Sequence, residues 1–133
     1  MNLAQVIHQR WAAAAALSAL LPASRVYTGA SFDPAPPLAV MTKESDKPDS
    51  YQSDGSAIDL IVLRMRVLHA HYDAAAEIVH EVKKAFDRTS FALAGGDTVL
   101  NMQRLNDYEQ QRSDGTWEMI VDFKCTVYLA SGV

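Results

Sequence analysis

The sequence is poor in the residues on which disulfide frameworks and membrane spans depend. It has a single cysteine, Cys125, so no disulfide can form within the chain. No apolar run approaches the ~20 residues that cross a bilayer, so we expect no transmembrane helix and no membrane partner. Cys125 falls at an apolar position of an alternating pattern, which is typical of a small buried hydrophobe and not of a nucleophile. The 133 residues fit one domain, which we assign to residues 1–133.

An excess of positive charge is also lacking. The net charge is -4, whereas surfaces that grip nucleic acid through its phosphates are usually basic. We therefore expect no tight binding of DNA, although a passive conduit for DNA is compatible with weak repulsion. Arg64 and Arg66, together with Lys43 and Lys47, could line a basic strip, but polar residues on the solvent side of a sheet explain them more simply.

Motifs of catalysis, phosphate binding and metal binding are missing too. There is no Gly-x-Ser-x-Gly, and Gly95-Gly96-Asp97 lacks the Lys-Ser/Thr of a phosphate loop. His69, His71 and His80 surround a predicted strand–helix junction, but no cysteine or carboxylate completes a recognisable ligand spacing. We predict no catalytic residue, no cofactor and no metal, and therefore no enzyme.

The clearest positive signal is a hairpin at residues 98–129. Its turn contains Asp114-Gly115, a pair that favours tight hairpin turns because glycine tolerates a positive φ. In the second arm, apolar residues alternate from Trp117 to Leu129, and the intervening residues are mostly polar. This period of two predicts a strand with one face on a core. A two-stranded hairpin is marginal alone, so the rest of the chain has to cover it.

The remaining segments complete an α+β pattern. We predict helices at 2–21 and 74–87, strands at 25–28, 38–42 and 57–70, a proline-rich loop at 29–37, and an exposed mobile loop or long hairpin tip at 44–56. The order is α-β-β-β-α-β-β, without the βαβ alternation of a parallel sheet. An antiparallel or mixed sheet of about four or five strands, with both helices packed on it, is the economical fold.

Several strands carry apolar residues on the face that should be outward. Such positions predict burial against a second helix or another subunit, and the polar loops offer further contacts. The candidate residues for a subunit or partner interface are Tyr51, Asp54, Arg64, Arg66, Ser113, Asp114, Ile120 and Tyr128. They share an outward position on a predicted strand face or at a predicted loop.

The order of segments resembles a known family, the small tail-completion or tail-terminator-like proteins of long-tailed bacteriophages and prophages. The matching pieces run from Leu20-Leu21-Pro22 and Arg25-Val26-Tyr27 through Pro34-Ala35-Pro36-Pro37 and Leu38-Ala39-Val40, then through the strand 58–67, His69 and the helix 74–86, to the arms 100–111 and 115–128. The resemblance implies a structural protein with an α+β fold and no catalytic residues.

The same resemblance implies a role and a set of partners. Proteins of this kind form a ring, usually of six subunits, that caps the tail tube, ends its polymerisation and joins the head–tail interface. The partners would be other copies of the chain, the tail-tube protein and head–tail connector proteins, with DNA passing through the ring. The location would be the tail or neck of the virion, and the bacterial host cytoplasm during assembly.

Three alternatives stay open at this point. The chain could be another neck or head–tail connector subunit. It could be a small α+β enzyme or ligand-binding domain that uses its histidines, or a generic dimeric interaction module.

Overall fold

The computed structural model describes residues 1–29 and 35–133. In these residues the elements follow the order α1 (Leu3–Ala13), α2 (Ala15–Leu20), β1 (Val26–Thr28), β2 (Leu38–Tyr51), β3 (Ala57–His69), α3 (Tyr72–Phe86), β4 (Thr89–Ala92), β5 (Thr98–Gln111) and β6 (Trp117–Leu129). None of the described helices is both long and apolar enough to cross a bilayer.

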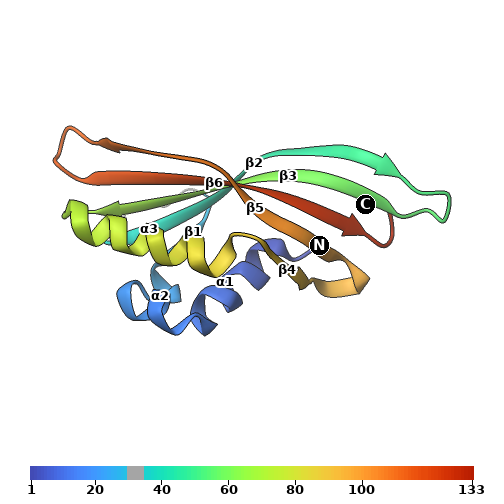
Figure 1. Cartoon of the computed structure of the whole chain (residues 1–133), viewed down its shortest axis with the longest axis horizontal. Coiled ribbons are helices and arrows are strands. Elements are labelled where there is room, and N and C mark those ends of the chain that lie inside the picture. The colour runs from blue at the N-terminus through green and yellow to red at the C-terminus, as the bar shows by residue number, and fades with distance from the viewer. Residues whose placement is uncertain (30–34) are drawn as a thin grey trace.

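The described strands form one curled sheet in the order β1-β2-β3-β6-β5-β4 (Figure 1). β1 runs parallel to β2, and the other neighbours are antiparallel, so the predicted mixed sheet in an α+β fold is confirmed. The sheet has one strand more than the predicted four or five. The additional strand is β4, whose four residues show too little alternation to be recognised in the sequence.

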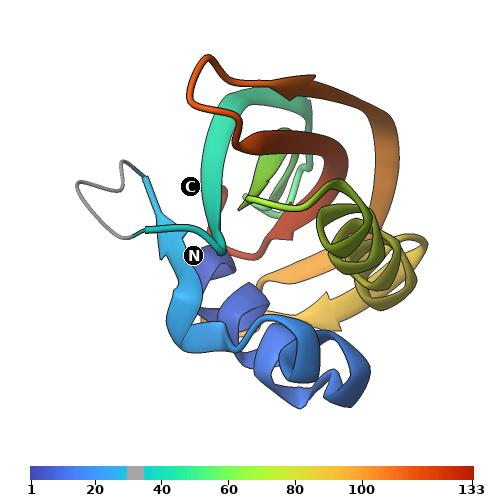
Figure 2. The ribbon, with the colours of Figure 1, turned by 90° about the vertical axis from the view of Figure 1, so that its left-hand side faces the viewer.

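The helices cover one face of the sheet, and the opposite face curls away from them (Figure 2). The core lies between the two layers and is built by an aromatic series. Trp11 of α1, Phe86 of α3 and Phe123 of β6 are almost completely buried, with ring centroids 6.3 and 6.4 Å apart for the successive pairs. Tilted and edge-on aromatic pairs at this spacing are favourable beyond their buried area. The predicted burial of the apolar face of 117–129 is confirmed, although Trp117 at its start is only half-buried.

The predicted helix at 2–21 is interrupted at Ala14. Ala14 adopts an extended conformation, with φ -81° and ψ 96°, which separates α1 from α2. The Trp11 indole N–H donates to the carbonyl of Leu21 at 2.7 Å inside the core. The chain therefore turns back over the Trp11 side chain, a tertiary preference that outweighs the strong helix propensity of the alanines.

Most of the predicted loop at 44–56 is strand. β2 continues to Tyr51 in register with β3, and only residues 52–56 form the turn. Register shifts between Lys43 and Ser45, and between Pro48 and Ser50, absorb the irregular polar sequence as β-bulges. Of the two readings offered for this segment, the long hairpin is the correct one. The proline-rich loop predicted at 29–37 lies partly outside the described residues.

Candidate assembly interface

The face of the sheet that carries no helix, called here the open face, holds a partly buried ion pair. Arg64 of β3 donates two hydrogen bonds to Asp122 of β6, Nε to Oδ1 at 2.8 Å and a terminal nitrogen to Oδ2 at 3.1 Å. Asp122 is 4% exposed. These bonds raise the pKa of the Arg64 guanidinium, although burial opposes them. A bidentate pair of this kind fixes the two strands relative to each other.

Arg64 and Arg66, which were considered and set aside as part of a basic strip, are paired with carboxylates inside the subunit. Arg64 also lies 3.5 Å from Glu44, and Arg66 lies 3.8 Å from the same carboxylate. The guanidinium of Arg64 sits 5.7 Å from the ring centroid of Tyr108 on β5, within reach of a cation–π interaction. Paired and stacked in this way, Arg64 offers little free charge to DNA phosphates.

The expectation that Ile120 is exposed is wrong, because the residue is 4% exposed, and its role as a contact residue stays a prediction. In the ladder, Ile120 lies between Arg66 on β3 and Tyr108 on β5. These long side chains and the curl of the sheet bury a position that simple alternation assigns to the outside. Tyr128, on the same face near the other end of β6, is half-buried.

A second carboxylate is buried on the open face. Glu118 is 5% exposed and accepts a hydrogen bond from Arg112 at 2.8 Å and another from Gln110. Burial alone would raise the pKa of Glu118, but the hydrogen bonds from Arg112 and Gln110 outweigh it and lower the pKa below its usual value. Both buried acids of this face, Asp122 and Glu118, thus have an arginine partner in the same subunit.

The two hairpin turns lie at opposite ends of the molecule (Figure 1). In the β2–β3 turn, Asp54 accepts from the backbone N–H of Ser56 at 3.0 Å and from its hydroxyl at 2.6 Å. In the β5–β6 turn, Asp114 accepts from the N–H of Thr116 at 2.9 Å. These bonds lower the pKa of both carboxyls. Asp54 and Asp114 therefore stabilise the conformation of their own turns.

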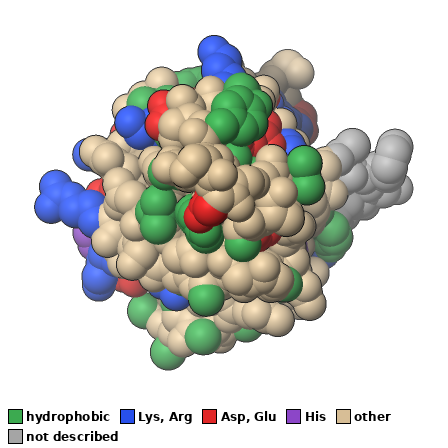
Figure 3. Space-filling view, turned by 90° about the vertical axis from the view of Figure 1, so that its right-hand side faces the viewer, with side chains coloured by type: hydrophobic (Ala, Val, Ile, Leu, Met, Phe, Trp, Pro, Cys, Tyr) green, Lys and Arg blue, Asp and Glu red, His purple; other side chains and the backbone are tan. Residues whose placement is uncertain are grey.

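The remaining predicted contact residues of the turns are exposed. Tyr51 is 74% exposed where β2 ends, and Ser113 is exposed in the other turn. On the end of the molecule that carries the β2–β3 turn, hydrophobic side chains are scattered, and Lys and Arg side chains gather toward one edge (Figure 3). The eight predicted contact residues are thus spread over two ends and one face and do not form a single patch.

Two long strand edges have no strand partner in the described part of the chain. β1 pairs with β2 only at residues 39–41, which leaves the outer edge of β2 open at 42–51. β4 pairs with β5 no further than Met102, and the N–H of Arg104 is taken by Asp87 at 2.8 Å. The outer edge of β5 is therefore open at 105–111. Unpaired edges are ready templates for strand addition.

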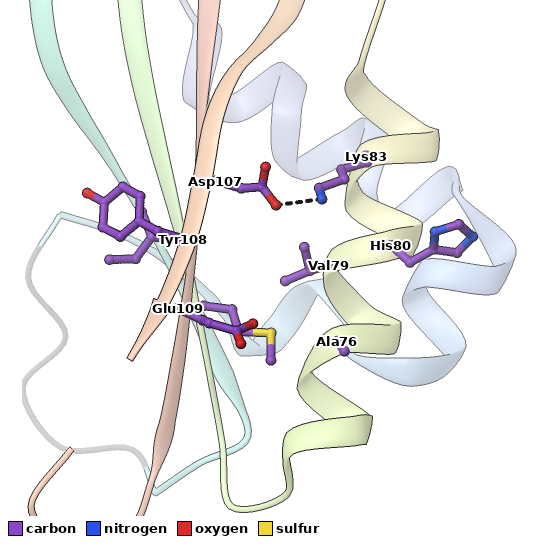
Figure 4. A pocket seen from close by; sticks show the side chains of 9 residues that line it. Ala76, Val79, His80, Lys83, Asp107, Tyr108 and Glu109 are labelled. Carbon is purple, nitrogen blue, oxygen red and sulfur yellow. Dashed lines mark hydrogen bonds and ion pairs between the residues drawn. The ribbon is translucent and has the colours of Figure 1, made fainter. Parts of the chain in front are cut away.

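A groove of about 460 Å³ runs beside the open edge of β5, between that strand and α3 (Figure 4). Its floor contains Val79 and Met119, and its walls carry charged side chains. Lys83 of α3 and Asp107 of β5 are joined by a 2.7 Å ion pair, and Arg104 lies 3.1 Å from the same carboxylate. The Lys83 hydrogen bond, followed by the charges of Lys83 and Arg104, lowers the pKa of Asp107 despite some burial.

His80 lies apart from the neighbouring pair His69 and His71. The rings of His69 and His71 are 5.7 Å apart, whereas His80 lines the groove on α3. The described residues contain no group of three or more side chains of the metal-binding types close enough to hold an ion. Burial, with a smaller contribution from His71, lowers the pKa of His69. Burial also raises the pKa of the Cys125 thiol to about 12, which makes it a poor nucleophile.

The sequence indicated Arg64 as a candidate residue but did not indicate the side chains that it contacts within the subunit. Arg64 was a candidate, but Asp122 and Tyr108, which hold it, were not. The signal was present: in a correctly aligned ladder Asp122 lies directly opposite Arg64. That alignment depends on strand order, which the sequence alone left open. The groove between α3 and β5 was missed for the same reason.

Comparison with known proteins gives a family and a fold. The family model described as "Tail completion protein gp17" matches residues 5–128. Among solved structures, a chain in "Virion of native gene transfer agent (GTA) particle" is similar with a TM-score of 0.72 and 15% identity, over 92% of this chain and 91% of that chain. At this identity the likeness shows the fold alone. A comparison with curated proteins finds no match. Through the family match, which covers nearly its whole length, this chain belongs to the tail completion protein gp17 family and is a structural protein of the virion tail, not an enzyme.

Proposed function

We propose that the protein forms a ring of six subunits that caps the tail tube, ends its polymerisation and contributes to the surface on which the head docks. The observation that carries the ring is the pair of open edges, 42–51 on β2 and 105–111 on β5. They lie on opposite sides of the sheet, and a ring needs two different patches on each subunit that meet head to tail.

The offset between the two edges supports closure. The middle of the β5 edge, Tyr108, lies opposite Ile120, whereas the middle of the β2 edge, Asp46, lies opposite Ile61 and through it opposite Cys125. The midpoints are therefore about five residues, or about 17 Å, apart along the strands. One subunit contributes four strand spacings, about 19 Å. If the midpoints of neighbouring edges meet, these two lengths require the strands to tilt by about 40° relative to the ring axis. This tilt is within the 35–45° that is typical of closed barrels.

The number of strands makes the ring an open passage. Six subunits, each contributing β2, β3, β6 and β5, would give a barrel of about 24 strands, wider than the ~16–18-stranded barrels that already enclose an aqueous channel. If the helices lie on the outside, the open face lines this channel. Its paired arginines would not hold DNA strongly, in agreement with passive passage.

The proposed partners follow from this position. They are neighbouring copies of the chain, the tail-tube protein on one side of the ring and connector proteins on the other, with DNA inside. Before assembly the protein would reside in the bacterial host cytoplasm. Its negative net charge helps to keep free subunits apart.

The direct test is a tube-capping assay. The tail-tube protein of the same phage is polymerised with and without this protein, and tube lengths are measured by electron microscopy. We expect shorter tubes of narrower length distribution, each with a ring at one end. Rings of about six times the 14.6 kDa subunit should appear by mass photometry, either free or after release from tubes.

Two outcomes would redirect the proposal. Unchanged tube lengths, together with binding to isolated heads or connectors, would favour another neck subunit. Stoichiometric zinc that is lost in the His69→Ala/His71→Ala variant would revive the ligand-binding alternative, which has no support in the described geometry.

A further inference from the structure

We propose that the groove between α3 and β5 is the receptor for the β2 edge of a second copy of this chain, and that charge order sets the alignment. This inference rests on the proposed ring and names the residues by which neighbours recognise each other. The occupant is a strand, because the groove runs beside an open strand edge and not beside a closed surface (Figure 4).

The direction of docking follows from the sheet. β2 is antiparallel to β3, β3 to β6, and β6 to β5, so β2 and β5 run in opposite directions within one subunit. Rotation about a ring axis preserves the direction of each strand along that axis. The β2 edge of a neighbour therefore meets β5 as an antiparallel strand, the pairing that extends the existing ladder.

The charges along the β5 edge have an order. Arg104, Asp107 and Glu109 lie in the ladder opposite Phe123, Val121 and Met119, which belong to the core layer beneath the helices. On this face, the cationic end consists of Arg104 and Lys83 of α3, and the anionic end is Glu109. Asp107 lies between them, bound to both cations.

On the same face, the β2 edge also has its positive residue before its negative residue along the chain. Because β2 and β5 run in opposite directions, the two charge orders are opposite in space. Lys43 and Asp46 lie opposite Leu63 and Ile61, two core residues, and form a 3.4 Å ion pair with each other. When the neighbour docks antiparallel with its Lys43 opposite Glu109, its Asp46 falls two ladder positions further on, opposite Asp107, where Lys83 and Arg104 are the nearest cations. The two edges thus present complementary charges without a change in either subunit's own ion pairs.

The alternative of two identical edges meeting is opposed by the β2 sequence. Pro48 supplies no N–H, and the two bulges that flank residues 45–48 interrupt the regular edge. In a β2–β2 contact both strands would carry these interruptions, whereas in a β2–β5 contact only one strand does. The β5 edge has no proline between residues 98 and 111, which makes it the receptive partner.

The experiment exchanges charges and leaves the β2 ion pair intact. The variant Lys43→Glu/Asp46→Lys keeps its internal pair but reverses the order presented to the neighbour. The complementary variant is Arg104→Glu/Glu109→Lys. Ring formation is measured by mass photometry and by counting capped tubes, and folding of each variant is checked by its melting temperature. The control is Glu81→Lys/Lys84→Glu, a pair on α3 outside the groove.

We expect each reversal alone to raise the concentration for half-maximal ring formation by about tenfold or more, and the combined four-residue variant to return to within about threefold of the wild type. The control should match the wild type. Rings that form normally in either single reversal, or a combined variant that does not recover, would overturn the groove proposal and leave the ring standing. A wild type that neither forms rings nor caps tubes would overturn the ring itself.

Discussion

The two faces of the sheet are held by different kinds of interaction. The centre of the face under the helices is apolar, and Phe123, Val121 and Met65 are buried there among other hydrophobic side chains, whereas charged residues such as Asp107 lie at its edge. The open face buries a smaller apolar cluster of Leu38, Val40 and Leu68, together with two carboxylates. One face is thus held mainly by packing, and the other by a smaller apolar contact and specific ion pairs.

The two kinds of contact have different consequences: apolar packing stabilises the fold, whereas the ion pair sets the alignment of the strands. Apolar burial is roughly proportional to area and has no direction, so many alignments of two strands would satisfy it partly. The pairing of Arg64 with Asp122 is satisfied only when β3 and β6 are aligned as they are here. Buried pairs contribute little net stability, because desolvation offsets their attraction, but removing one partner is costly. We infer that the open face fixes the alignment that the core stabilises.

The largest effect should come from the core. Phe123→Ala removes a fully buried ring that packs edge-on against Phe86, and should lower the free energy of unfolding by about 4 kcal/mol. Chemical denaturation followed by circular dichroism measures this loss. The matched control is Tyr51→Ala, at an exposed aromatic position, which should leave the free energy almost unchanged. Equal losses for both variants would mean that the core does not depend on this face.

The second effect tests the ion pair of the open face. Asp122→Ala leaves Arg64 with Glu44 as its remaining carboxylate, and should cost about 2 kcal/mol. The cost stays below that of a fully buried pair because the Arg64 side chain is 25% exposed. The double variant Arg64→Leu/Asp122→Leu should recover most of the loss, since no charge is left unpaired.

If the double variant recovers its stability, we still expect a measurable change in how firmly β3 and β6 are held together. If the pair fixes register, the amide hydrogens of β3 and β6 should exchange faster with solvent in the double variant than in the wild type, even at equal stability. Unchanged exchange protection would separate the pair from register and leave it a role in stability alone.

How far the sequence predicted the fold differs between these two faces. The apolar face of β6 could be read because its alternation is long and regular, and α3 because its stripe and charge order agree. The break at Ala14 could not be read, because it depends on the Trp11 side chain reaching the Leu21 carbonyl. The extent of β2 could not be read either, because polar residues 44–51 are held as a strand by pairing with β3 and not by their own preferences.

The candidate site was less predictable than the fold. Arg64 and Tyr51 could be named as single residues, but which residues share a place depends on strand order and curl. Ile120 was assigned outward by alternation and is buried by the long side chains beside it. The Lys83–Asp107 pair joins residues 24 positions apart across a groove that no local pattern indicates.

The smallest effect concerns acid pH and again distinguishes the faces. Glu118 has a pKa below its unfolded value of 4.5, because the hydrogen bonds from Arg112 and Gln110 outweigh burial. A carboxyl with a depressed folded pKa adds stability that is complete above the unfolded pKa and is lost as the pH falls through the folded pKa. The wild type should therefore lose more stability between pH 7 and about pH 3.5 than Glu118→Gln, whose amide does not titrate. Urea midpoints at the two pH values measure the difference. Phe123 does not titrate, and its removal leaves every carboxyl in place, so Phe123→Ala should lose as much between the two pH values as the wild type. Equal acid losses in the wild type and Glu118→Gln would show that burial of this carboxylate cancels its hydrogen bonds, and that Arg112 holds the turn without stabilising the charge.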